Sequence, residues 1–291
     1  MDKKLEKLRS DYKNVPIPDN LDMIVKKAIK RSMRKKFPFK SMTGFVTAAL
    51  FVLSINTSST FAKTLSNVPI LGKVVNVLTF TEYTLDEPTY KANLKVPAVT
   101  NLKNKDLEQS LNKKYLDENK ELYDQFTKEI EYVKKETSGA HLGIDSGYEV
   151  KTDNEDILSI GRYVVNTAAS SSTTMKFDTV DKKKEILLSL PILFKDKSYV
   201  KIISENIKEQ MNEQMKKDEN KVYWIPEANL DYSIDPFTSM KEDQNFYINK
   251  DHKLVISFDK YEIAPGYMGV VEFTIPTDIL SNILVGHHYI R

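Results

Sequence analysis

The most apolar part of the chain is residues 44–62, GFVTAALFVLSINTSSTFA. Its apolar core, residues 45–55, is interrupted by only one Thr and one Ser, and it is short for a bilayer-spanning helix, which needs about 20 apolar residues. Counted over residues 41–62, however, the segment carries no charged side chain at all. The pattern therefore predicts a transmembrane anchor over residues 41–62, with polar ends.

Two longer segments repeat their apolar residues at helical spacing, one from about residue 106 to 137 and one from residue 198 to about 217. Residues that recur every three or four positions lie on one face of a helix. The expected inner faces consist of Leu107, Leu111, Tyr115, Leu122, Phe126, Ile130 and Val133 in the first segment and of Val200, Ile203, Ile207 and Met211 in the second. Ser138 and Gly139 predict the end of the first helix.

Between and after these helices the pattern is that of strands. Pro88 and Pro97 exclude a helix from residues 83–99, and two or three strands are expected between residues 147 and 177. A DKKK turn then precedes EILLSL, and further strands are expected at FYIN, LVISFDKYEI and VVEFTIP. The links are too short for parallel crossovers. The sequence therefore predicts an α+β fold with a mostly antiparallel sheet packed with two long helices.

Residues 1–40 contain two short amphipathic stretches separated by VPIPD, with basic residues around the second. Two interpretations stay open. The segment either lies on anionic lipid or docks a cytoplasmic partner. The candidate partner-binding residues are Leu5, Leu8, Tyr12, Leu21, Ile24, Val25 and Ala28.

The segment directly after the anchor, residues 63–82, also has a helical pattern. Its apolar positions are Ile70, Leu71, Val74, Val75 and Leu78. We expect an amphipathic helix there. It is either an ordinary core helix or a cover for the base of the part that follows.

The distribution of charge predicts the topology. Of the 43 basic and 41 acidic residues, 13 and 5 lie in residues 1–40, a formal charge of +8, and none lies in residues 41–62. Positive charge beside a membrane segment stays in the cytoplasm, so residues 1–40 are expected inside the cell and residues 63–291 outside, in a single-pass protein of the cell membrane. The outer part keeps 30 basic and 36 acidic residues, a charge of −6, which suits a cationic partner and disfavours a nucleic-acid surface.

The end of the apolar run resembles a cleavage site. Ala62 has a small side chain, and Thr60, two positions before it, has a modest one. Signal peptidase recognises this spacing of small residues. The segment thus fits both an anchor and a signal peptide.

No catalytic motif occurs in the sequence. With no Cys, the chain has no disulfide, thiolate metal site or Cys nucleophile. The four His residues have no zinc-binding spacing, and there is no nucleophile elbow, P-loop or dinucleotide motif. We therefore expect neither enzymatic activity, nor a metal, nor a cofactor.

One loop stands out chemically, YEIAPGYMG at Tyr261–Gly269. Its Pro265-Gly266 pair predicts a type II turn between two strands. Tyr267 either folds back onto the sheet or projects as a rigid recognition element, because a proline-stiffened turn offers an aromatic contact at low entropic cost. The hydroxyl-rich run at residues 170–174 is expected at a strand edge or in a solvated loop, with a contact role as the alternative.

The chain resembles the RsiV family of membrane-bound anti-sigma factors from low-GC Gram-positive bacteria. The resemblance extends from the inner helices to the C-terminus. It is most specific in NVLTFTEY, in FDTVDKKKEILLSLPILFKDKSYVKIISENIKEQM and in FYINKDHKLVISFDKYEIAPGYMGVVEFTIP.

The resemblance implies that the inner segment binds an extracytoplasmic-function sigma factor and that the outer part is a receptor for lysozyme, a cationic muramidase. Lysozyme would expose the signal-peptidase site at Thr60 and Ala62, and an intramembrane site-2 protease would then cut the anchor. The resemblance carries Pro265, Gly266 and Tyr267 to the lysozyme interface, and more weakly Ser171 or Ser172.

These arguments divide the chain into a sigma-binding segment (1–40), an anchor with a latent cleavage site (41–62), a juxtamembrane segment (63–82) and the two halves of an outer part (83–185 and 186–291). Two alternatives remain. The chain could be a membrane-anchored protein that acts on or binds the cell wall, although it lacks any catalytic motif. It could also be a lysozyme inhibitor without signalling, which would not need a patterned inner segment.

Overall fold

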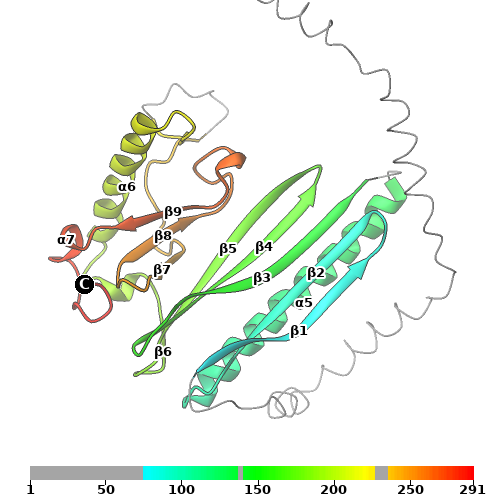
Figure 1. The fold of residues 1–291 in the computed structure, drawn as a ribbon, viewed down its shortest axis with the longest axis horizontal. Helices are drawn as coiled ribbons and strands as arrows, with labels where there is room; N and C mark the ends of the chain where they lie inside the picture. Colours follow the sequence, from blue (N-terminus) through cyan, green and yellow to red (C-terminus); the bar gives the residue numbers. More distant parts are fainter. Residues whose placement is uncertain (1–74, 137–139, 227–234) are drawn as a thin grey trace, which may run out of the picture. The chain divides into compact units, whose positions relative to one another are not determined.

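The computed structural model describes residues 75–136, 140–226 and 235–291, all of which lie within one compact unit, Thr57–Arg291. The strands of this part form a six-stranded sheet in the order β1-β2-β3-β4-β5-β6 and a three-stranded sheet in the order β7-β8-β9 (Figure 1). The large sheet consists of β1 (Asn76–Asp86), β2 (Tyr90–Thr100), β3 (Leu142–Asp153), β4 (Ile157–Ala168), β5 (Ser170–Asp181) and β6 (Ile186–Leu188). The small sheet consists of β7 (Phe246–Ile248), β8 (Leu254–Phe258) and β9 (Val271–Ile275). The helices are α5 (Lys105–Glu136), α6 (Ser198–Lys217) and α7 (Thr277–Leu280), with single 3-10 turns η1 (Pro191–Leu193) and η2 (Gly266–Met268).

Neighbouring strands are antiparallel except β2 and β3, which run parallel. A parallel pair needs a long crossover, and α5 supplies it because it lies between these two strands in the chain. The α+β class and the mostly antiparallel pairing predicted from the sequence are therefore confirmed. Both long helices are confirmed too, while β3 begins at Leu142, earlier than expected.

The prediction of a helix over residues 70–78 is wrong for the residues that the structure describes. Asn76 and Leu78 belong to β1, where they pair with Thr100 and Ala98 of β2. The pattern of apolar positions was compatible with a helix, but the ladder with β2 satisfies the backbone of this segment as a strand. The preceding positions Ile70, Leu71 and Val74 lie outside the described residues.

Helix α5 covers one face of the large sheet and packs mainly on β2 (Figure 1). The β2–β3 ladder ends at Leu94 and Ser146, so the backbone of Val99 has no strand partner on that side. Asn112 of α5 replaces the missing strand: its Oδ1 accepts from the Val99 N–H at 2.7 Å and its Nδ2 donates to the Val99 carbonyl at 2.8 Å. Both groups are buried, so this side chain satisfies backbone groups that would otherwise destabilise the sheet.

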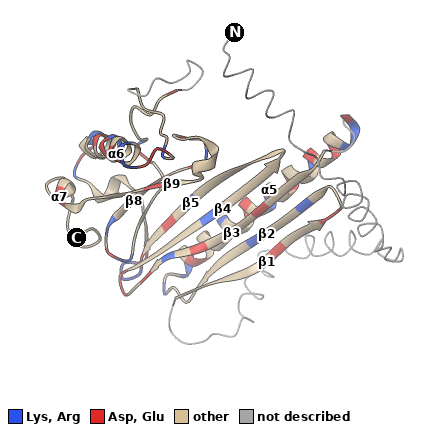
Figure 2. Ribbon diagram, turned by 45° about the horizontal axis from the view of Figure 1, so that its top comes forward, with Lys and Arg blue, Asp and Glu red and all other residues tan. Residues whose placement is uncertain are grey.

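The outer face of α5 is solvated. Acidic and basic residues are interspersed along the helix (Figure 2), and they include ion pairs one helical turn apart at Lys113–Asp117 and Lys120–Asp124. Exposed pairs of this kind contribute little, typically 0.3–0.5 kcal/mol. The stability of α5 therefore depends on its inner face.

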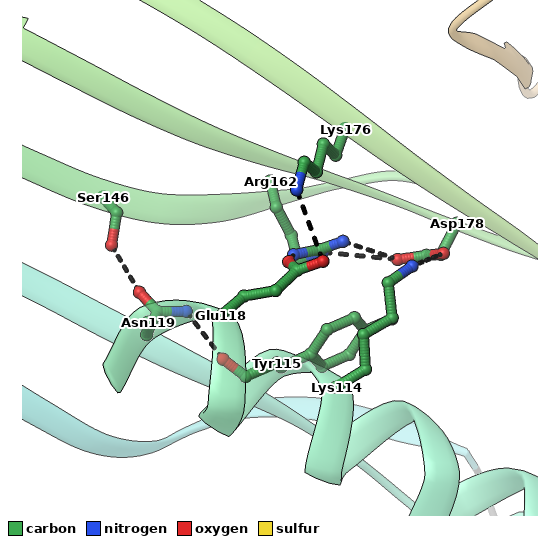
Figure 3. Close-up of polar contacts among 8 residues, drawn as sticks. All are labelled: Lys114, Tyr115, Glu118, Asn119, Ser146, Arg162, Lys176 and Asp178. Carbon is green, nitrogen blue, oxygen red and sulfur yellow. Dashed lines mark hydrogen bonds and ion pairs between the residues drawn. The ribbon is translucent and has the colours of Figure 1, made fainter. Parts of the chain in front are cut away.

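A cluster of charged side chains lies between α5 and the strands β4 and β5 (Figure 3). Arg162 of β4 donates to Asp178 of β5, with 3.1 Å between Nη2 and Oδ2, and also donates to Glu118 of α5. Lys114 reaches Asp178 at 2.8 Å, and Lys176 reaches Glu118 at 3.3 Å. Charges of opposite sign thus alternate through the cluster, and each buried charge has a partner.

The small sheet packs on the opposite face of the large one. The carbonyl of Ile248 in β7 accepts from Thr152 at 2.7 Å and from Ser159 at 3.3 Å, and the rings of Phe177 and Tyr247 stack with centroids 5.0 Å apart. Residues of α6, the small sheet and the C-terminal segment form one apolar core around Ile203, Ile207, Phe258, Phe273 and Leu280. The second half of the chain thus has its own core, joined to the large sheet through β4, β5 and β7.

None of the described helices is long and apolar enough to cross a membrane. The predicted anchor, residues 41–62, lies outside the described residues.

Arg162→Met tests the buried charge cluster. Only 3% of the Asp178 side chain is exposed, and the substitution removes the guanidinium that pairs with this carboxylate. We expect a loss of about 3 kcal/mol in the free energy of unfolding, measured by urea denaturation. Lys113→Met, which breaks the exposed pair with Asp117, is the control and should cost less than about 1 kcal/mol. Equal losses for the two variants would contradict a stabilising role of the cluster.

Candidate recognition surface

The loop between β8 and β9 is anchored in its middle and exposed on either side. Ile263 and Ala264 are buried, and the Ile263 carbonyl accepts a hydrogen bond from the N–H of Trp224 at 2.8 Å. Tyr261 before them and Tyr267 after them are exposed. The buried pair therefore fixes the loop, so that it can present two tyrosines to solvent.

The predicted type II turn at Pro265-Gly266 is wrong. That turn requires a left-handed residue after the proline, whereas Gly266 begins the 3-10 turn η2 and the left-handed residue is Gly269, with φ 68° and ψ −149°. The N–H of Met268 bonds to the carbonyl of Pro265 at 2.9 Å, and that of Gly269 to the carbonyl of Gly266 at 3.2 Å. The chain thus makes one extra turn before it enters β9, and Met268 packs against the core.

The exposure of Tyr267 excludes one of its two interpretations and is compatible with the other. Its side chain is 67% exposed, so the ring does not fold back onto the sheet. Its hydroxyl donates to the carbonyl of Asn220 at 3.1 Å, which orients the ring without burying it.

Glycine at position 266 is explained by the ring of Tyr261. A Cβ at Gly266 would lie 2.2 Å from the Tyr261 ring, so the ring rests directly against the glycine. Tyr261 itself has a φ of 72°, the left-handed conformation that is uncommon for a bulky residue. The two sides of the loop thus support each other.

The predicted strand LVISFDKYEI is correct only as far as Phe258, where β8 ends. Asp259 and Glu262 then close a tight corner: the Glu262 carboxylate accepts from the Asp259 N–H at 2.8 Å, and the Glu262 N–H donates to the Asp259 carbonyl at 3.0 Å. The alternating pattern continued through these residues. The left-handed Tyr261 turns the backbone away from the strand direction.

The hydroxyl run lies at the start of β5, at an edge of the sheet. β6 pairs only with residues 179–181 of β5, so the earlier part of β5 has no strand partner on that side. The expectation of a strand edge for residues 170–174 is therefore confirmed.

Ser171 and Ser172 point to opposite faces of the sheet because side chains alternate along a strand. Ser172 is on the same face as Lys176, whose ammonium contacts α5. Ser171 is on the other face, where its Oγ accepts a hydrogen bond from Lys260 Nζ at 2.9 Å. The same ammonium lies 5.2 Å from the centroid of the Tyr261 ring. The structure thus brings Ser171, and not Ser172, beside the loop that carries Tyr267.

Lys260 and Tyr261 are the members of this surface that sequence reasoning did not single out. Both lie where the alternating pattern of the sequence continues past the end of β8. The left-handed φ of Tyr261 and the approach of the β5 edge are tertiary features with no local signal. We call Ser171, Lys260, Tyr261, Pro265, Gly266 and Tyr267 the recognition surface.

A depression lies between α5 and the large sheet. It has a volume of about 280 Å³ and is lined by polar and charged groups that include Glu118, Asn119, Ser146, Arg162 and Lys176. These groups bond to one another: the Ser146 hydroxyl donates to Asn119 Oδ1 at 2.7 Å, and Glu118 and Arg162 belong to the charge cluster (Figure 3). The arrangement serves to hold α5 on the sheet.

The pKa values in this cluster follow from burial and pairing. Burial disfavours the charged form of Glu118, but the Arg162 guanidinium outweighs it and lowers the pKa of that carboxyl below its ordinary value. Burial, followed by the negative charge of Asp178, raises the pKa of Tyr115 well above its ordinary value. Both side chains are thus held in their ordinary protonation states, as expected of structural residues.

Among residues 75–136, 140–226 and 235–291, no group of three or more His, Asp or Glu side chains could hold a metal ion. The predicted cleavage residues Thr60 and Ala62 lie outside the described residues. The same is true of the candidate sigma-binding residues Leu5, Leu8, Tyr12, Leu21, Ile24, Val25 and Ala28.

Comparison with known proteins first gives a class. Residues 192–278, which include the loop between β8 and β9 that we call the recognition loop, match the family described as "Protein of unknown function (DUF3298)". A solved DUF3298 protein from Bacteroides fragilis NCTC 9343 shares the fold, with a TM-score of 0.53 and 16% identity over 73% of this chain and 94% of that one. A second, from Pseudomonas aeruginosa PAO1, gives a TM-score of 0.49 and 14% identity over 72% and 93% of the two chains.

A relative in sequence gives the family. The anti-sigma-V factor RsiV of Bacillus subtilis (strain 168) is 48% identical to this chain over 293 residues, which cover 100% of both proteins. The chain therefore belongs to the RsiV family, as its sequence motifs predicted.

Gly269→Ala tests the backbone of the recognition loop. A Cβ at this position meets no atom within 4 Å, so any cost comes from the backbone conformation, which only glycine adopts readily. We expect a loss of about 1–3 kcal/mol in the free energy of unfolding, measured by denaturant titration. Gly286→Ala is the control, because that glycine also has open space around it but no left-handed φ, and it should change stability by less than about 0.5 kcal/mol. Similar values for the two variants would contradict the strain argument.

Proposed function

We propose that this protein is a membrane-bound anti-sigma factor that keeps an extracytoplasmic-function sigma factor inactive and acts as a receptor for lysozyme. The observation that carries the proposal is the 48% identity, over the full length of both chains, to a protein named as an anti-sigma factor. In this proposal residues 1–40 bind the sigma factor in the cytoplasm, residues 41–62 anchor the chain in the cell membrane, and the remainder lies outside.

The recognition surface supports a lysozyme-binding role for the outer part. A narrow convex loop fits a glycan-binding cleft better than a flat sheet does, and the loop after β8 exposes Tyr267 to solvent. Residues 63–291 carry a formal charge of −6, which favours the approach of a cationic enzyme. In this proposal Tyr267 and Pro265 enter the lysozyme cleft while Ser171 contacts its rim.

The proposed signal is proteolysis. Lysozyme binding exposes the site at Thr60 and Ala62 to signal peptidase, and an intramembrane site-2 protease then cuts the remaining anchor and frees the sigma factor. A lysozyme inhibitor without signalling, or an anchored protein that only binds the cell wall, is the competing function. Deletion of residues 1–40 distinguishes the two functions. An anti-sigma factor would lose its control of the sigma factor, whereas an inhibitor or a wall-binding protein would keep its function.

The test of the proposed function is calorimetric titration of the full-length protein, purified in detergent, with hen-type lysozyme. A second titration uses lysozyme whose cleft is occupied by a chitooligosaccharide. Binding that the sugar abolishes supports a receptor that reads the substrate cleft. No binding in either titration would refute the lysozyme receptor, and binding that the sugar leaves unchanged would refute the cleft as the contact.

Tyr267→Ala should weaken lysozyme binding by about 2 kcal/mol, or about 30-fold, because an exposed aromatic on a fixed loop is a typical interface anchor. The measurement is the same titration. Tyr132→Ala is a matched control, since Tyr132 of α5 is 66% exposed against 67% for Tyr267. If both variants bind as tightly as the unmodified protein, Tyr267 is not part of the interface.

Ala62→Trp should block the first cleavage, because signal peptidase requires a small side chain at the last position before the cut. Cells with this variant should keep the full-length protein when lysozyme is added and should not activate sigma-dependent transcription. Immunoblotting and a transcriptional reporter measure the two effects. Lys63→Trp, on the other side of the proposed cut, is the control, and normal processing of Ala62→Trp would mean that the cut lies elsewhere.

A further inference from the structure

The recognition surface is assembled from two segments about ninety positions apart in the chain, Ser171 on β5 and the loop after β8. Something must hold these segments together if they are to form one surface. The contacts between them are concentrated at the corner that begins with Asp259 and at the unpaired edge of β5.

Besides the bond between Lys260 and the Ser171 side chain, three hydrogen bonds join the backbone of this edge to the second half of the chain. The Asp259 carboxylate accepts from the N–H of Met175, with 2.7 Å between Oδ1 and N. The N–H of Lys260 donates to the carbonyl of Thr173 at 3.0 Å, and the side-chain amide of Asn245 donates to the carbonyl of Met175 at 2.9 Å. Together they satisfy backbone groups that β6 leaves unpaired.

The corner that begins with Asp259 is itself fixed by contacts of Glu262. Glu262 accepts the N–H of Asp259 through Oε2, and its Oε1 lies 3.2 Å from the ammonium of Lys241 and 3.4 Å from the side-chain amide of Gln244. The Asp259 carboxylate is therefore directed at β5 by a fixed backbone. Of the three contacts, it is the only one in which a charged side chain accepts a backbone N–H, which is the stronger kind of hydrogen bond.

The corner is coupled to Tyr267 through a short chain of contacts. Asp259 and Lys260 lead directly into the left-handed Tyr261, and the Tyr261 ring rests against Gly266, the neighbour of Tyr267. A shift of the corner relative to β5 would therefore move the support of the Tyr267 loop and would separate Lys260 from Ser171.

We propose that Asp259 is a positioning residue of the lysozyme-binding surface: its carboxylate fastens the β8–β9 loop to the edge of β5 and so holds Tyr267 and Ser171 in one continuous surface. The inference rests on the proposed function. Asp259 is not expected to contact lysozyme itself. It acts by reducing the loss of freedom that the loop would otherwise suffer on binding.

The surroundings of Asp259 agree with this role. Burial raises the pKa of its carboxyl above the ordinary value, and the nearby Glu262 adds to the rise, whereas the hydrogen bond from Met175 opposes it. The charged form of an aspartate in such surroundings loses part of its solvation free energy. The hydrogen bond to the strand edge offsets part of this cost, and the positive charge of Lys241 acts in the same direction.

The experiment compares Asp259→Ala with Asp259→Asn in the full-length protein. Asn retains a carbonyl oxygen that can accept from Met175, whereas Ala does not. Calorimetric titration with hen-type lysozyme should show a loss of about tenfold or more for the Ala variant, and less than about threefold for the Asn variant. Asp251→Ala is the control for lost negative charge, because Asp251 is an exposed residue of the β7–β8 turn, and it should bind within about twofold of the unmodified protein.

A second readout separates positioning from general destabilisation. If Asp259 positions the loop, the loss of affinity of the double variant Asp259→Ala/Tyr267→Ala should be smaller than the product of the two single losses. The reason is that Tyr267 contributes less binding energy once the loop is released. Multiplicative losses, unchanged affinity of the Ala variant, or equal losses for Ala and Asn would each overturn the proposal.

Hydrogen exchange distinguishes a failure of this inference from a failure of the proposed function. In the absence of lysozyme, the Met175 amide should exchange faster in the Ala variant than in the unmodified protein. If the unmodified protein does not bind lysozyme but Met175 exchange responds as expected, the proposed function is wrong while the attachment of the loop stands. If Met175 exchange is unchanged, the attachment is wrong whatever the titration gives.

Discussion

An unpaired strand edge must find hydrogen bonds elsewhere, and the edge of β5 is where this requirement shapes the protein. Because β6 is only three residues long, most of β5 has no strand partner on that side. The second half of the chain supplies the partners through Asp259, Lys260 and Asn245. These hydrogen bonds take the place of a paired strand and join the loop after β8 to the large sheet. They therefore place Tyr267 and Ser171 on the same surface.

The face of the large sheet that α5 covers is stabilised by a different kind of interaction. Asn112 completes the backbone of β2, and the alternating charges around Arg162 connect α5 to β4 and β5. Buried charges of this type are expensive to remove from water, and they are tolerated because each has a partner. The sheet is thus fixed by α5 on one face, which leaves its other face and its edge for contacts with the second half of the chain.

The arrangement bears on the proposed role of this protein as a lysozyme receptor. The recognition surface combines an anchored loop, a strand edge and two exposed tyrosines. Binding energy at such a surface comes from shape complementarity and from the small loss of conformational entropy on binding. The site proposed for proteolysis lies in a separate part of the sequence, before β1, so the proposed function requires binding at the recognition surface to change the access of a protease to residues near Ala62.

The sequence by itself determined the elements whose pattern is local. The periodicity of α5 and α6, the alternation of β4 and β5 and the exclusion of a helix by Pro88 and Pro97 each depend on neighbours within a few positions. The motifs that indicated the RsiV family, and the choice of Tyr267 as an exposed candidate, likewise came from local stretches.

The limits of this reasoning appear at Leu78, whose helical spacing was overridden by pairing with β2, and at Gly266, whose expected turn was displaced to Gly269. Only the tertiary structure decided that Ser171 rather than Ser172 lies beside the loop, and that Lys260 and Tyr261 belong to the same surface. The physical reason is that these contacts depend on which strand edge remains unpaired, and that is settled by partners distant in the chain.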